Sequence, residues 1–172
     1  FCRYRQRCKS CGLAQGKGTV FIPIPRHRHK RTWHICAGQL IEWCPEAAVL
    51  SYNVLPNGTG KVSDTNAALA DILKRVKADT SHQYIVNMSL GGGGSAVSPS
   101  IVQQGKLISQ LVDENVPVCV SAGNDGKEAK LDVWPSCFHD PVCVAAIKRQ
   151  WRKSQFQYMA QRDGCCRCWR IY

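Results

Sequence analysis

The sequence lacks any run of about 18 or more apolar residues, so it contains no segment that could cross a membrane as a single helix. Its first residues, FCRYRQRCKSCG, lack the apolar core and the small-residue cleavage site of a secretory signal. Internal repeats are also absent. The 172 residues are 44% hydrophobic and 20% charged, which is typical of one soluble globular domain.

Acidic residues are scarce at both ends of the chain. Residues 1–44 hold nine Lys or Arg and one acid, and residues 149–172 hold six and one, whereas residues 45–148 hold eight and ten. A net charge of +11 by itself indicates nucleic acid or another acidic partner. Because the excess lies in the ends, we expect neither a nucleic-acid partner nor a membrane partner. The oligomeric state is left open.

The middle of the chain alternates between strand and helix patterns. Strands are expected at residues 47–55, 84–90, 116–125 and 142–148, and helices at 63–79 and 99–115. The first helix has Leu69, Ile72 and Val76 at helical spacing, and the second has Ile101, Ile108 and Leu111. This order predicts an α/β fold with a parallel sheet, in which ligands bind at the carboxyl ends of the strands.

Four glycines follow the strand in YIVNMSLGGGGS, residues 84–95. A plain turn needs fewer, and glycine allows a close approach of the backbone to another group. A dinucleotide or phosphate site is one interpretation. It is disfavoured because the spacing does not match G-x-G-x-x-G, no Walker-type Lys-Ser/Thr follows, and the next helix begins several residues later.

The cysteines permit a second interpretation. Cys8 and Cys11 have CxxC spacing and three histidines follow, at positions 27, 29 and 34, so a zinc site that binds nucleic acid is conceivable. A strong zinc signal has a second pair at matching spacing, and Cys165, Cys166 and Cys168 do not supply it. The sequence favours unpaired cysteines without metal.

Four segments in order, WCPEAAVLSYNVL, YIVNMSLGG, VPVCVSAGNDG and VCVAAI, resemble the subtilisin-like serine proteases, or subtilases. The resemblance covers roughly residues 45–147. It implies a three-layer parallel-sheet core, incomplete in this chain, and serine endopeptidase action on peptide or protein substrates. Secretion is common in the family.

The resemblance also implies roles for individual residues. Those matching Ser89, Leu90 and Gly91 pair with the substrate backbone and wall the specificity pocket, so the glycines let two main chains meet. Asn124 matches the side chain that donates to the oxyanion, a donor whose removal in subtilisin itself costs about 10²–10³ in turnover. His34 is the nearest candidate for the catalytic histidine, within RTWHICAGQL.

Two catalytic residues find no match in the chain. The family triad runs Asp, His, Ser, and its serine normally lies in a GTSMA segment, which this sequence does not contain. Neither the aspartate nor the serine can be assigned. No cofactor is assigned either: family members often bind structural calcium, but no clustered carboxylate loop places one here.

Shifts of reading frame account for the unusual ends. With permitted codons, a one-base shift converts RHRHKRTWH into DTDTNGHGT, the family's histidine motif, and comparable shifts restore family-like segments at the start and after Phe156. We therefore expect an irregular, non-native segment at residues 1–35, a partial subtilase catalytic domain at 36–156 and an irregular, non-native tail at 157–172. Such a chain folds poorly, exposes apolar surface and lacks catalysis.

Two other functions stay open. One is a peptide-binding module that keeps the Ser89 segment without cutting, and the other is a basic, cysteine-rich protein that binds zinc and nucleic acid. Peptide binding without cleavage would support the peptide-binding module, and a zinc-binding assay would test the zinc and nucleic-acid interpretation.

Overall fold

A computed structural model describes residues 18–23, 30–56, 58–95, 97–123 and 133–145, with side chains from Cys36 onward. The helices are α1 (Lys30–Trp43), α2 (Val62–Ala78) and α3 (Pro99–Asp113). The strands are β1 (Gly18–Pro23), β2 (Ala48–Tyr52), β3 (Gln83–Met88), β4 (Gly92–Gly93), β5 (Val118–Ser121), β6 (Val133–Trp134) and β7 (Val142–Val144).

Five of these strands form one parallel sheet in the order β2-β1-β3-β5-β7. Val20 of β1 lies opposite Val49 of β2 on one side and Ile85 of β3 on the other. Because all five strands run the same way, their carboxyl ends share one edge of the sheet. The remaining strands, β4 and β6, form a separate antiparallel pair.

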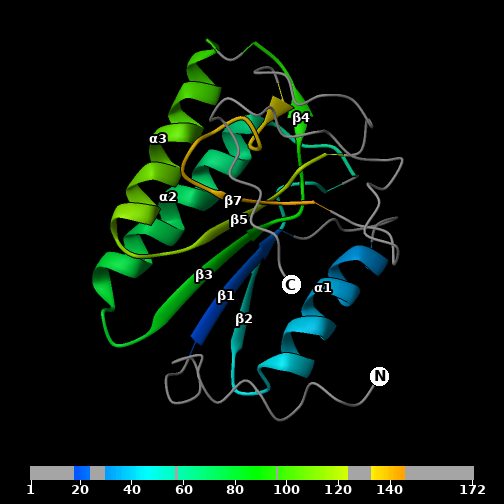
Figure 1. Cartoon of the computed structure of the whole chain (residues 1–172), viewed down its shortest axis with the longest axis vertical. Coiled ribbons are helices and arrows are strands. Elements are labelled where there is room, and N and C mark those ends of the chain that lie inside the picture. The colour runs from blue at the N-terminus through cyan, green and yellow to red at the C-terminus, as the bar shows by residue number, and fades with distance from the viewer. Residues whose placement is uncertain (1–17, 24–29, 57, 96, 124–132, 146–172) are drawn as a thin grey trace.

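Helices α2 and α3 lie side by side on one face of the sheet (Figure 1). Their apolar stripes meet the alternate residues of β3 and β5 that face them, and together they form the main core. The stripe residues of α2 are Leu69, Ile72 and Val76, and those of α3 are Ile101, Leu107, Ile108 and Leu111, all buried.

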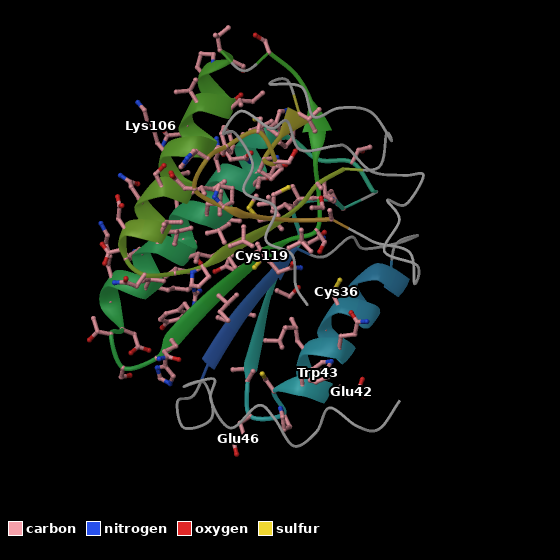
Figure 2. All side chains as sticks on the ribbon, in the orientation of Figure 1. Cys36, Glu42, Trp43, Glu46, Lys106 and Cys119 are labelled. Atoms are coloured by element: carbon pink, nitrogen blue, oxygen red, sulfur yellow. The ribbon has the colours of Figure 1, made fainter. Side chains whose placement is uncertain are left out.

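Helix α1 lies on the other side of the sheet, beside β1 and β2 (Figure 1). Among the side chains that the structure describes from Cys36 onward, Ala37 is the one buried side chain in the small cluster that α1 forms with Cys36, Leu40, Ala47 and Val49. Trp43, at the carboxyl end of the helix, is 67% exposed (Figure 2).

The expected α/β parallel sheet is confirmed, and the two expected helices agree with α2 and α3 to within two residues at each end. The amino-terminal part differs. Strand β1 and the first turns of α1 lie within residues 1–35, which were expected to be irregular. The reason is that GTVFIP has the β-branched and aromatic residues of a strand, although basic residues flank it.

None of the helices in the described part of the chain is long and apolar enough to cross a membrane.

Candidate functional site

The candidate site lies at the carboxyl edge of the sheet, where β3 and β5 end. Strand β3 runs directly into Ser89, Leu90 and Gly91, and β5 ends at Ser121. The hydroxyl of Ser121 donates a hydrogen bond to the carbonyl oxygen of Leu90, with an oxygen–oxygen distance of 3.0 Å. The structure therefore joins the segment that follows β3 to the end of β5, as the sequence pattern predicts for a site in a parallel sheet.

Ser89 is exposed and held by groups from two elements. The side-chain amide of Asn87 donates to Ser89 Oγ at 2.9 Å. Cys36 Sγ of α1, the helix on the face of the sheet opposite α2 and α3, lies 3.9 Å from Ser89 Oγ. Helix α1 thus reaches the same edge as the segment expected to bind peptide (Figure 2 labels Cys36).

The glycine run is shaped by Trp134. A Cβ atom added to Gly92 would lie 2.8 Å from Cζ2 of the Trp134 ring, and one added to Gly94 would lie 3.2 Å from its Nε1. A Cβ atom added to Gly91 would lie 3.3 Å from the carbonyl oxygen of Trp134. The close approach that the glycines were expected to provide therefore includes a contact with the chain's own indole ring.

The backbone of the glycine run also contacts the segment that carries Trp134. Gly92 and Gly93 pair antiparallel with Trp134 and Val133, so β6 occupies one side of β4. The sequence did not predict this pairing, because two-residue strands carry no periodicity. Ser89, Leu90 and Gly91 lie just before β4.

The side chains of the other two candidate residues are not described. His34 lies within helix α1, but its side chain falls outside the described part of the structure. Asn124 follows Gly123 directly and also lies outside the described residues. Their assignments as general base and oxyanion donor stay predictions. Ser121, Asn87 and Trp134 were not singled out as site residues by the sequence, although Ser121 begins the SAGN motif.

Cys119 of β5 lies opposite Asn87 in the sheet, and its burial disfavours the thiolate form. Desolvation by burial raises the pKa of Cys119 above its usual value. The thiolate is the reactive form of cysteine, so this residue stays protonated near neutral pH. Figure 2 labels Cys119, which lies on β5.

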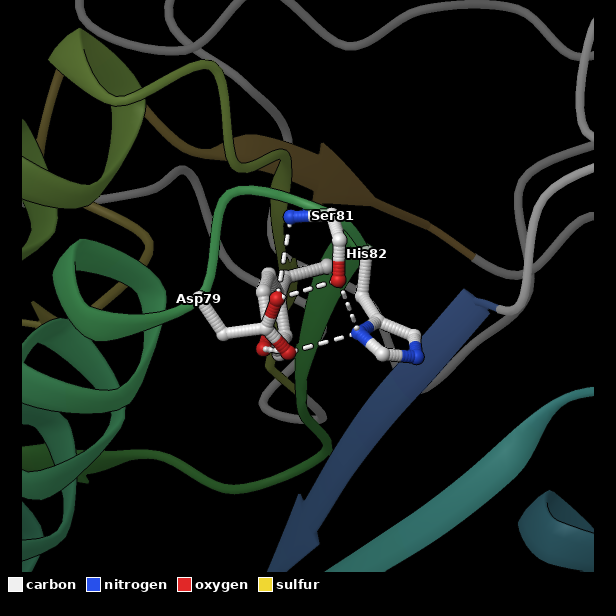
Figure 3. A network of polar contacts seen from close by, with 4 residues as sticks. Asp79, Ser81 and His82 are labelled. Atoms are coloured by element: carbon white, nitrogen blue, oxygen red, sulfur yellow. Dashed lines mark hydrogen bonds and ion pairs between the residues drawn. The ribbon is translucent and has the colours of Figure 1, made fainter.

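A cluster of Asp79, Ser81 and His82 lies at the opposite edge of the sheet, before β3 begins (Figure 3). Asp79 Oδ2 lies 2.6 Å from His82 Nδ1, and Ser81 Oγ lies 3.1 Å from the same nitrogen. A catalytic triad needs the acid at one imidazole nitrogen and the serine at the other. Both groups here approach Nδ1, so the cluster is not a triad.

The cluster instead stabilises the turn between α2 and β3. Asp79 Oδ1 accepts hydrogen bonds from Ser81 Oγ and from the Ser81 backbone N–H, at 2.6 and 2.9 Å, and Tyr84 OH donates to Asp79 Oδ2 at 3.0 Å. The Ser81 hydrogen bonds are the main cause of the strongly lowered pKa of Asp79.

Metal binding finds no support in the part of the chain that the structure describes. No group of three or more His, Cys, Asp or Glu side chains there is arranged to hold an ion. The cysteines of the zinc interpretation, Cys2, Cys8, Cys11, Cys165, Cys166 and Cys168, all lie outside the described residues.

Comparison with solved structures supports the fold. The chain is 25% identical to the "S41 Psychrophilic Protease", with a TM-score of 0.57, covering 70% of this chain and 39% of that one. It is 16% identical to a lanthipeptide protease, with a TM-score of 0.66 and coverage of 84% and 54%. It is 15% identical to the prenylagaramide maturation protease PagA, with a TM-score of 0.65, and this match covers 87% of this chain and 62% of that one. The chain thus spans less than two thirds of each of these proteins.

No curated protein matches the chain significantly. The sequence pattern of the Subtilase family matches residues 31–164, a range that includes α1, the Ser89 segment and β7. Since this range is more than half of the 172 residues, the chain is a member of the subtilase family and holds part of its catalytic domain.

Proposed function

We propose that the protein of which this sequence forms part is a serine-type endopeptidase that hydrolyses peptide bonds through an Asp/His/Ser triad. One observation carries the proposal: the Ser89 segment lies at the carboxyl edge of the sheet and is hydrogen-bonded to the end of β5, the strand that leads to Asn124. Substrate backbone and oxyanion donor must meet at one peptide bond, and this connection supports the proposal because it joins the Ser89 segment to the strand that precedes Asn124 in the sequence.

The proposed roles follow serine protease chemistry. A serine hydroxyl attacks the scissile carbonyl, a histidine accepts its proton, and an aspartate orients the histidine. In this chain, Ser89, Leu90 and Gly91 hold the substrate backbone, Asn124 donates to the oxyanion, and His34 is the candidate histidine. The substrate is a peptide or protein.

We further propose that the 172-residue chain binds peptide without hydrolysing it, because no residue in it is assigned as nucleophile. The test uses an internally quenched decapeptide with a fluorophore and a quencher at its ends. Binding is followed by fluorescence anisotropy of the same sequence carrying the fluorophore alone, and cleavage is followed by fluorescence increase. Saturable binding with no cleavage supports the proposal. Cleavage that a serine-directed fluorophosphonate abolishes shows that the chain contains a nucleophile, and no binding contradicts the assignment of the Ser89 segment.

The ends of the chain are a separate proposal: residues 1 to about 35 and 157–172 arise from shifted reading frames. Sequencing the encoding DNA across codons 25–40 and 150–165, and past the stop codon, tests it directly. Single-base changes that restore HGT and reveal a downstream GTSMA support the proposal. A DNA sequence that confirms the frame as written and contains no serine motif contradicts it.

A further inference from the structure

We propose that Ser121 is a positioning residue for peptide binding, because its hydroxyl fixes the Ser89 segment relative to the strand that leads to Asn124. The inference rests on the proposed function and adds a residue to it. It starts from one contact between elements far apart in sequence: Ser121 Oγ at the end of β5 donates to the carbonyl oxygen of Leu90, just after β3.

The acceptor is in a place where such a bond matters. Leu90 is only 8% exposed, so its carbonyl oxygen depends on protein partners rather than bulk water. Residues 89–91 lie beyond β3, whose last ladder pair with β5 joins Met88 to Val120. The regular sheet hydrogen bonds therefore end one step before this segment, and the Ser121 hydroxyl extends the connection between the two strands past the ladder.

The donor side is equally constrained. Ser121 pairs with Val144 of β7 in the register of the sheet, and the next residue, Ala122, donates its backbone N–H to the Val144 carbonyl at 3.0 Å. The strand that carries the hydroxyl is thus fixed on its far side. A Cβ atom on Gly91 would lie 4.0 Å from Ser121 Oγ, so the hydroxyl also lies beside the last residue of the peptide-binding segment.

The consequence for function is geometric. A peptide bound along residues 89–91 lies next to the Ser121 hydrogen bond, and Asn124, the proposed oxyanion donor, follows three residues after Ser121 in the sequence. In the protease of which this sequence forms part, a misplacement of about 1 Å between binding and reacting groups would cost about 10²-fold in rate, whereas in this chain the effect is on peptide binding. Loss of the hydroxyl should loosen residues 89–91 while leaving the packed core of α2, α3 and β5 in place.

The test compares Ser121→Ala, Ser121→Thr and the control Ser109→Ala in the full 172-residue chain. Threonine keeps the hydroxyl and suits a strand. Ser109 also bonds through its hydroxyl, to Asp140, but on α3 away from the sheet edge. The probe is a fluorescein-labelled hexapeptide of alanine and leucine, with binding measured by anisotropy. The ¹³C shift of the Leu90 carbonyl is recorded in each variant, and thermal unfolding checks folding.

We expect Ser121→Ala to bind the peptide about three- to tenfold more weakly, the effect of one lost hydrogen bond. Ser121→Thr should bind within about twofold of wild type, and Ser109→Ala should be unchanged. The Leu90 carbonyl shift should move in Ser121→Ala alone.

Two results would overturn the inference and are distinguishable from each other. If wild type binds and Ser121→Ala binds equally well, or if threonine and alanine are equally weak, the hydroxyl does not position the segment. If wild type does not bind at all, the proposed function fails and this role of Ser121 fails with it. The Leu90 shift then still reports whether the hydrogen bond exists.

Discussion

Replacing Gly92 with alanine should destabilise the fold through one contact, between the added methyl group and the Trp134 ring. The new Cβ would lie 2.8 Å from Cζ2 and 3.1 Å from Cη2 of that ring. Overpacking of this kind costs about 1–3 kcal/mol. Alanine recovers about 0.4–1 kcal/mol by restricting the unfolded chain. The net destabilisation is about 1–2 kcal/mol, which lowers the melting temperature by about 2–8 °C for a chain of this size.

Gly93 is the matched control. It is the second residue of the same strand, and a Cβ there would meet no atom of the described part of the chain within 4 Å. Neither Gly92 nor Gly93 has a positive φ angle, so alanine is not strained at either position. Gly93→Ala should therefore leave the free energy of unfolding unchanged or raise it by up to about 1 kcal/mol.

Thermal and urea unfolding of both variants check the prediction, and a double-mutant cycle identifies the cause. In a Trp134→Leu background, the smaller side chain removes the clash, so Gly92→Ala should lose most of its cost. Equal stability of Gly92→Ala and Gly93→Ala would refute the reasoning. So would an undiminished cost of Gly92→Ala in the Trp134→Leu background.

Four further changes have expected outcomes. Burial and the 2.5 Å hydrogen bond to Asp71 raise the pKa of Tyr52 to about 12. The free energy of unfolding should therefore fall as pH rises from about 10 to 12, by about 1 kcal/mol after solvent screening. Tyr52→Phe should abolish this fall in urea unfolding. The pKa of Asp79 is lowered in the folded state, so this carboxylate stabilises the fold above the pKa of an unfolded aspartate, near 4, and the stabilisation is lost as pH falls below about 4. Asp79→Asn should flatten the acid limb of a stability–pH profile. An unchanged acid limb would contradict this. Both amide atoms of Gln104, which is 0% exposed, lack a hydrogen-bond partner among the described residues. Gln104→Met should therefore raise the free energy of unfolding by about 1 kcal/mol, whereas a loss would show that the amide is satisfied. Trp43→Ser should reduce binding of a hydrophobic dye without lowering the melting temperature, because its ring is mostly exposed.

The sequence predicted the parts of the fold that have strong periodicity. Ile101, Ile108 and Leu111 recur at helical spacing and are buried on one face of α3. Strand β3 was recognisable because its apolar run ends in glycines. Strand β1 was missed because the surrounding basic residues outweighed its six-residue pattern.

For the site, sequence reasoning located the segments but not their contacts. The carboxyl-end rule for parallel sheets predicted that Ser89, Leu90 and Gly91 lie near the end of β5, and the Ser121 hydrogen bond agrees with it. The contact of Trp134 with the glycine run joins residues about 40 positions apart through a two-residue pairing, and no local pattern encodes it.

The small cluster that α1 forms with residues at β2 has a consequence for how the site is lost. Among the described side chains, Ala37 is the only buried one in this cluster, whereas α2 and α3 share the main core. Local opening should therefore begin at α1, at a lower free energy than global unfolding. Because α1 carries Cys36 to within 3.9 Å of Ser89, heat or denaturant should remove this contact with the proposed peptide-binding segment while the sheet is still intact. Peptide binding would then fail before the fold does.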